Sequence, residues 1–189
     1  MSSPKRIGLY GGTFDPFHEG HLHLIEQLLA LDLVDELIVV PAGKPWLRGS
    51  APIAPPADRL AMAQMAIKDL PAQIRDHVWV NDIEIKREGP TYTIDTVEEF
   101  KKYQPDARWI LILGSDVYSG IKKWHRAAEL RELVEFLVIA RDGEGLNIDA
   151  LPVSASGIRQ QIKAGESAIK YLPESVWTYI KERNLYASK

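Results

Sequence analysis

The residues best suited to do chemistry lie near the N-terminus, in the segment GGTFDPFHEGH that spans residues 11–21. A short apolar run precedes this segment at 7–10, and apolar residues at helical spacing follow it from Leu22. A glycine turn between a strand and a helix presents backbone N–H groups that, together with the helix dipole, attract anions. His18 and His21 would lie on one face of the first helical turn, where each could donate a hydrogen bond to the same phosphate chain. The segment therefore predicts binding of the phosphates of a nucleotide.

Two other interpretations of these residues stay open on this evidence. The glycines match neither G-x-G-x-x-G nor a loop ending in G-K-[ST], and a glycine turn after a strand is often only a turn. Histidine is also a common metal ligand, although Glu19 would point elsewhere on a helix and no third ligand is evident. A structural role and a metal site thus remain alternatives to phosphate binding.

Strands and helices alternate along the chain that positions this segment. Strands are predicted at 7–10, 36–40, 109–113 and 136–140, with one or two more within 78–85. Helices are predicted around 22–29 and 60–66, at 94–103 with Thr93 as N-cap, from an N-cap at Ser156 to near Gly165, and from Pro173 onward. This pattern favours an α/β fold, a Rossmann-like doubly wound parallel sheet in a single domain over residues 1–189 with C-terminal helices.

In such a sheet, ligands bind beyond the carboxyl ends of the strands. The segments 11–21, 41–48 and 114–116, and Arg141, each directly follow a predicted strand, so we expect them to gather at one rim. The loop at about 41–56 contains five prolines and is the least regular part of the chain. We interpret it as a candidate lid.

The composition excludes several classes of protein. Lys and Arg number 23 against 26 Asp and Glu, a net charge of −3, so no general surface for nucleic acid is implied. The chain has no cysteine, which excludes disulfides and thiolate zinc sites. No apolar run approaches the ~20 residues that span a bilayer, and residues 1–6 lack the apolar core of a signal peptide. We expect a cytoplasmic protein with no nucleic-acid or membrane partner, and no particular oligomeric state is predicted.

The segment 11–21 resembles the signature of the HxGH nucleotidyltransferase superfamily. Its GGTFDP form is similar to that of bacterial nicotinate-nucleotide adenylyltransferases, whereas phosphopantetheine adenylyltransferases usually carry threonine where this chain has His18. The resemblance extends from about residue 7 to residue 186. It implies that His18 and His21 are catalytic and contact the phosphates of ATP. It also implies ATP contacts from the turn residues Gly11, Gly12, Thr13 and Phe14.

Three further segments carry the resemblance on the ATP side. Residues 154–159, Ser-Ala-Ser-Gly-Ile-Arg, resemble the family's S-x-T-x-x-R, with serine for the usual threonine and the hydroxyl kept. The match implies that Ser154, Ser156 and Arg159 bind ATP, the arginine through the β- or γ-phosphate. Residues Gly114 and Asp116 resemble a G-x-D segment whose aspartate accepts from ribose hydroxyls, and Arg141 matches a family arginine beside the nucleotide. Without the resemblance, segments 154–159 and 114–116 would be interpreted as ordinary helix N-termini, and Arg141 as a surface charge.

The second substrate would contact another set of residues. Thr91 and Tyr92 belong to a P-[ST]-Y-T element that lines the mononucleotide pocket of the family, and Trp124 falls where the family places an aromatic on the pyridine ring. The segment 44–48, Lys-Pro-Trp-Leu-Arg, departs from the commoner PPHK-type loop and is closer to a Q-P-W-x-K variant. It places Lys44, Trp46 and Arg48 at this pocket, with either Lys44 or Arg48 as its cation.

The resemblance implies transfer of AMP from ATP to nicotinate mononucleotide, which yields deamido-NAD and pyrophosphate in NAD biosynthesis. Mg²⁺ would arrive with ATP, since no carboxylate cage is visible in the sequence. Two alternatives remain. The acceptor could be nicotinamide mononucleotide, or the chain could be a nucleotide-binding sensor without turnover.

Overall fold

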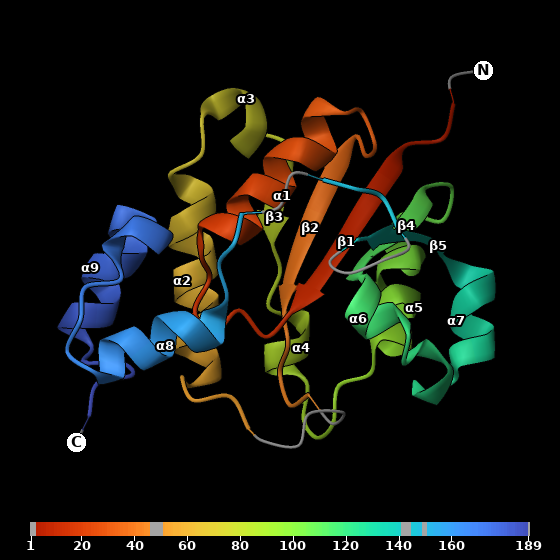
Figure 1. Cartoon of the computed structure of the whole chain (residues 1–189). Coiled ribbons are helices and arrows are strands. Elements are labelled where there is room, and N and C mark those ends of the chain that lie inside the picture. The colour runs from red at the N-terminus through yellow and green to blue at the C-terminus, as the bar shows by residue number, and fades with distance from the viewer. Residues whose placement is uncertain (1–2, 46–50, 141–144, 149–150, 189) are drawn as a thin grey trace.

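A computed structural model describes residues 3–45, 51–140, 145–148 and 151–188 of the chain. Its centre is one parallel sheet in the order β3-β2-β1-β4-β5 (Figure 1). The strands are β1 (Arg6–Gly12), β2 (Glu36–Pro41), β3 (Val78–Val80), β4 (Arg108–Gly114) and β5 (Glu135–Ile139). The chain extends the sheet from β1 toward β3 first and then returns to add β4 on the other side of β1. The predicted doubly wound sheet is confirmed, and its switch point lies between β1 and β4.

Helices cover both faces of the sheet, as Figure 1 shows. One face carries α1 (Glu19–Ala30), α2 (Pro56–Lys68), α3 (Ala72–Arg75), α8 (Ala155–Lys163) and α9 (Glu174–Glu182). The other carries α5 (Thr93–Tyr103) and α7 (Ala127–Leu133). The short helices α4 (Ile83–Lys86) and α6 (Ser115–Tyr118) and the 3₁₀ turns η1 (Ile121–Lys123) and η2 (Ile169–Tyr171) complete the described elements.

Each face of the sheet has its own hydrophobic core. Along β4, Trp109 and Leu111 belong to the cluster under α5 and α7, whereas Ile110 and Ile112 belong to the cluster under α1, α2 and α9. The strand alternates sides at every residue, yet all four of these side chains are buried. A strand buried on both faces appears in the sequence as a continuous apolar run, which explains why 109–113 was predictable.

Two elements differ in detail from the sequence pattern. The first helix begins at Glu19, ahead of the apolar periodicity that starts at Leu22, because its first turn is polar. The region 78–85 holds one short strand, the smaller number predicted, and the rest of it forms the helical turn α4. The side chain of Asn81 accepts a hydrogen bond from the backbone N of Ile83 at 2.9 Å, which turns the chain out of the strand.

Three predicted helix starts are also off by one or two residues. Tyr92, not Thr93, is the N-cap of α5, and Pro173 is the N-cap of α9 rather than its first residue. Ser154, not Ser156, caps α8: its backbone is extended and its hydroxyl accepts from the backbone N of Gly157 at 3.2 Å. The cap depends on which residue leaves the helical conformation, and the hydroxyls of Ser154 and Ser156 were equivalent candidates by type.

Candidate active site

The turn between β1 and α1 forms one wall of the site. Phe14 has a positive φ of 50° and lies buried beneath the turn. A Cβ on Gly12 would lie 2.7 Å from the Phe14 ring, so the ring packs directly against that glycine. A Cβ on Gly11 would meet nothing within 4 Å, because this residue faces open space. Gly12 thus permits the packing, and Gly11 leaves room above the turn.

The two histidines of the segment lie at the start of α1 with their rings stacked. The ring centroids of His18 and His21 are 3.6 Å apart and the planes are inclined by 18°. The backbone N of His18, the N-cap, donates to Nδ1 of His21 at 3.1 Å. Because Nδ1 accepts, a neutral His21 carries its proton on Nε2. The predicted pair on one helical turn is therefore present, in a defined tautomer.

Gly20 explains how α8 reaches this pair. A Cβ at Gly20 would lie 2.7 Å from Cγ1 of Val153 and 3.1 Å from Nδ1 of His18. The segment that leads into α8 therefore packs against the start of α1 only because this position has no side chain. This approach brings Ser154 and the rest of the 154–159 motif to the histidines.

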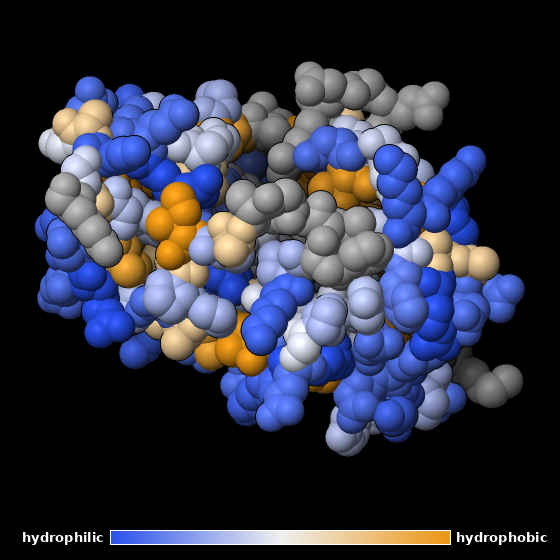
Figure 2. Space-filling view, turned by 90° about the horizontal axis from the view of Figure 1, so that it is seen from below, coloured by the Kyte–Doolittle hydropathy of each residue, from blue (hydrophilic) through white to orange (hydrophobic). Residues whose placement is uncertain are grey.

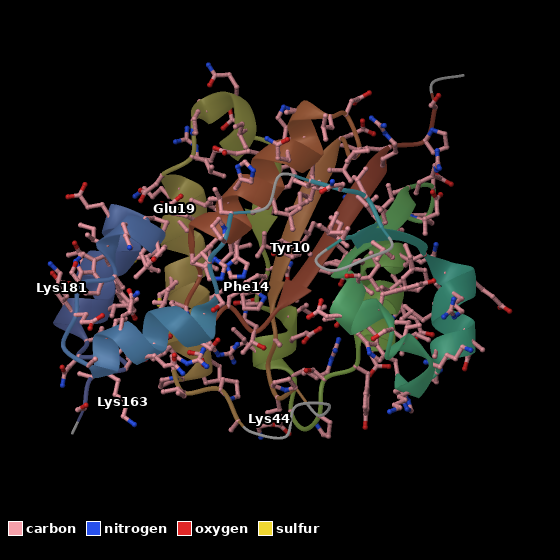
Figure 3. The ribbon with its side chains drawn as sticks, viewed as in Figure 1. Tyr10, Phe14, Glu19, Lys44, Lys163 and Lys181 are labelled. Carbon is pink, nitrogen blue, oxygen red and sulfur yellow. The ribbon has the colours of Figure 1, made fainter. Side chains whose placement is uncertain are left out.

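A cavity of about 550 Å³ opens between β1 and β4 at the carboxyl ends of the strands. Figure 2 views the molecule from this end, where hydrophilic residues predominate and hydrophobic ones show between them. Figure 3 places Tyr10 and Phe14 close together at the end of β1, and their ring centroids are 5.4 Å apart. The predicted residues that line the cavity are Gly11, Gly12, Thr13, Phe14, His18, His21, Thr91, Tyr92, Gly114, Asp116, Trp124, Ser154, Ser156 and Arg159.

The loop after β2 lies beside this cavity. Lys44 is exposed and lines a second cavity of about 670 Å³, together with residues 51–56. Pro45 lines both cavities and so marks the border between them. Trp46, Arg48 and Arg141 lie outside the described residues, and their roles stay predictions.

Comparison with known proteins identifies the family. A family model described as cytidylyltransferase-like matches residues 9–182. A probable nicotinate-nucleotide adenylyltransferase of Albidiferax ferrireducens is 38% identical, over 96% of this chain and 98% of its own length. Another, from Saccharopolyspora erythraea, is 35% identical over 98% of this chain and 92% of its own. The chain belongs to the nicotinate-nucleotide adenylyltransferase family.

A solved structure shows the same fold at lower sequence identity. The nicotinic acid mononucleotide adenylyltransferase of Plasmodium falciparum, complexed with NaAD, superposes with a TM-score of 0.82 at 23% identity, and covers 96% of this chain and 97% of its own. Family membership confirms the predicted enzyme class, a nucleotidyltransferase of NAD biosynthesis.

Two side chains of this adenylyltransferase-family cavity were missed by the sequence analysis. The ring of His125 stacks on Tyr92, with centroids 4.2 Å apart and an angle of 28°. Glu84 is buried and accepts from the hydroxyl of Thr96 at 3.1 Å. Burial raises the pKa of the Glu84 carboxyl above its usual value, against smaller lowering effects from hydrogen bonds with Thr91, Thr96 and the backbone of Gly43. In the sequence, the only sign that His125 and Glu84 belong to the site is that they lie near Trp124 and Thr91.

Arg59 is a third missed residue, fully buried in α2. Its Nη1 donates to the carbonyl oxygen of Thr13 at 2.7 Å, and its Nη2 donates to that of Gly43 at 3.3 Å. One guanidinium thus ties the turn after β1 to the loop after β2. It therefore holds these two walls of the site together.

Arg159 lies against the segment 11–21 in this structure. Its Nη1 donates to the backbone oxygen of Asp15 at 2.6 Å and lies 4.0 Å from the carboxylate Oδ2 of the same residue. The side chain is about one quarter exposed, at 24%, so part of it also faces the cavity.

The described part of the chain shows neither a clustered metal site nor a membrane-spanning helix. Within the described ranges, no three or more His, Cys, Asp or Glu side chains are grouped so as to hold a metal ion. None of the helices in the described part of the chain combines the length and apolar character needed to cross a bilayer.

Proposed function

We propose that this chain transfers AMP from ATP to nicotinate mononucleotide in the 550 Å³ cavity. The phosphates of ATP lie over the Gly11-Gly12 turn, between the stacked histidines and the start of α8, and Asp116 accepts from the ribose. The mononucleotide lies toward Thr91 and Trp124. Support comes from the placement of both residue sets around one cavity at the switch point of the sheet.

The reaction needs alignment more than proton transfer. An oxygen of the mononucleotide phosphate attacks the α-phosphorus of ATP, a new P–O bond forms, and the bond to the bridging oxygen of the β-phosphate breaks. Pyrophosphate leaves with that electron pair. Because the attacking oxygen is already anionic, no general base is required, and the site acts by positioning and by stabilising charge at the α-phosphate.

The observation that carries the proposal is the hydrogen bond from the backbone N of His18 to Nδ1 of His21, at 3.1 Å. It orients the imidazole and keeps the proton on Nε2, which donates to a phosphate oxygen where charge develops. Removal of one oxyanion donor typically costs about 2.7–4 kcal/mol of transition-state stabilisation, and we expect a loss of this size for His21→Ala. His21→Gln, which offers an amide N–H near the Nε2 position, keeps part of that rate.

Mg²⁺ fits this cavity as an ion carried by ATP. Phosphate oxygens and water would supply its coordination, because no group of carboxylates in the described part of the chain forms a metal site. The ion would neutralise charge on the phosphates. The hydrogen-bond donors of the protein then serve to orient the phosphate chain, and the protein need not hold the metal itself.

Pyrophosphate release tests the proposal directly. Purified protein is assayed with ATP alone, with ATP and nicotinate mononucleotide, and with ATP and nicotinamide mononucleotide. We expect release only with a mononucleotide, and fastest with the nicotinate form. Faster release with the amide would reassign the acceptor, and no release with either would favour a nucleotide sensor.

The roles of the loop residues Lys44, Trp46 and Arg48, and of Arg141, belong to the same proposal. So does a cytoplasmic location. If Lys44 is the loop cation, Lys44→Ala raises the KM for nicotinate mononucleotide and leaves that for ATP unchanged. If Arg48 is, the same result follows from Arg48→Ala.

A further inference from the structure

The hydroxyl of Tyr186, in the tail that follows α9, donates to the carboxylate Oδ1 of Asp15 at 2.7 Å. The tyrosine is only 9% exposed, although it lies four residues from the end of α9. Burial, and next the negative charge of Asp15, raise the pKa of Tyr186 far above its usual range, so the hydroxyl stays a donor. The C-terminal tail thus reaches into the wall of the site.

Among the described residues, the Asp15 carboxylate has two more donors, both from the segment before α2. The backbone N of Ile53 donates to Oδ2 at 2.8 Å, and that of Ala54 donates to Oδ1 at 3.1 Å. The Asp15 side chain is 5% exposed. A carboxylate buried to this extent is stable only when its oxygens are hydrogen-bonded, so the three donors hold it in one orientation.

Asp15 in turn holds Arg159. Nη1 of Arg159 donates to the Asp15 backbone oxygen at 2.6 Å and lies 4.0 Å from Oδ2. Both contacts are to one residue, so a shift of Asp15 moves the acceptor and the counter-charge of the arginine together. Tyr186 itself does not line the cavity, and its hydroxyl reaches the lining through Asp15.

We propose that Tyr186 is a positioning residue for ATP binding: its hydroxyl holds Asp15, and Asp15 holds Arg159 at the edge of the cavity. The proposal rests on the proposed function, in which Arg159 binds a phosphate of ATP. Removing the hydroxyl leaves Oδ1 with one donor, and the arginine loses its fixed orientation. The affinity for ATP then falls. The affinity for the mononucleotide changes little, because Arg159 is not proposed to contact that substrate.

Tyr186→Phe tests this, with Tyr179→Phe as its matched control. The hydroxyl of Tyr179 also donates at 2.7 Å to a buried aspartate, Asp58, but on the outer side of α2 against α9. Both variants delete one tyrosine hydroxyl from one buried carboxylate. Both should lower the melting temperature, so loss of stability alone cannot distinguish them.

Only Tyr186→Phe should raise the KM for ATP, by about fivefold to tenfold if most of one hydrogen bond to a charged group is transmitted to Arg159. The KM for nicotinate mononucleotide should stay within about twofold of wild type, a change too small to represent a lost contact. All assays are run below the unfolding transition of each variant. Equal KM values for ATP in the two variants would overturn the proposal.

A double-mutant cycle and a binding measurement complete the test. In an Arg159→Ala background, Tyr186→Phe should have no further effect on ATP, because the hydroxyl acts through that arginine. Additive effects would show that Tyr186 acts by another route. The Kd for ATP, titrated without a second substrate, should rise with the KM. This readout needs no turnover, so it remains valid even if the proposed acceptor is wrong.

Discussion

Replacing Arg59 by methionine removes a buried guanidinium that joins the turn after β1 to the loop after β2. The guanidinium donates to the carbonyl oxygens of Thr13 and Gly43, at 2.7 and 3.3 Å, and is fully buried. Methionine fills much of the same volume without a donor. The variant therefore tests the hydrogen bonds rather than a cavity.

The expected loss of stability follows from these contacts. Two buried carbonyl groups left without this donor cost about 1–3 kcal/mol each, and the removal of a buried guanidinium returns part of that cost. We expect a net loss of about 3 kcal/mol, which for a chain of this size lowers the melting temperature by about 6–12 °C. Because both loops lose their common support, kcat/KM should fall for ATP and for the mononucleotide together.

Thermal unfolding and steady-state kinetics check this, with Arg108→Met as the control. Arg108 also makes two guanidinium hydrogen bonds, to Glu135 at 2.9 and 2.8 Å, but on the surface and away from the cavity. The control should change neither the melting temperature nor the kinetics appreciably. The reasoning is refuted if Arg59→Met melts within about 2 °C of wild type, which would correspond to 1 kcal/mol or less.

Two further predictions use the same structure. A Cβ at Gly43 would lie 2.1 Å from the backbone oxygen of Glu84, whereas one at Gly11 would meet nothing within 4 Å, so Gly43→Ala should lower the melting temperature and Gly11→Ala should not. Gly11→Ala should instead raise the KM for ATP, since its methyl group enters the cavity; an unchanged KM would place the phosphates elsewhere. The raised pKa of Glu84 means that the folded state binds its proton more tightly than the unfolded state, so stability falls as pH rises above 4.5 toward the folded pKa. The melting temperature of wild type relative to Glu84→Gln should therefore decrease from pH 4 to pH 7, and a pH-independent difference would contradict this.

The strands were predictable where burial on both faces made them continuously apolar, as along β4. The helical turn after β3 was not, because Ile83-Glu84-Ile85-Lys86 alternates apolar and charged residues like a half-buried strand. A local side-chain contact decides between the two: Asn81 accepts from the N of Ile83 directly after β3. Over four residues, such a turn signal outweighs an alternating pattern.

The site residues that sequence reasoning found are those expected to touch a ligand, because ligand chemistry restricts residue types at short spacing. His18 and His21 are three positions apart, and Ser154, Ser156 and Arg159 lie within six residues. The structure adds how they meet, through the absence of a side chain at Gly20. What each of them binds stays a prediction.

The contacts of Asp15, Arg59 and Tyr186 gave no such signal, because their partners are distant in sequence. Arg59 donates to a carbonyl 46 positions away, and Tyr186 donates to a carboxylate 171 positions away. By type, all three resemble ordinary surface residues, and only the fold shows that they are buried. A site that stabilises charge works only if its donors are already oriented when the substrate arrives. Buried groups that contact the turn's own carbonyl oxygens and carboxylate can supply that orientation without occupying the cavity. The positions that preorganise this site are therefore determined by long-range packing, and they become visible only in the folded chain.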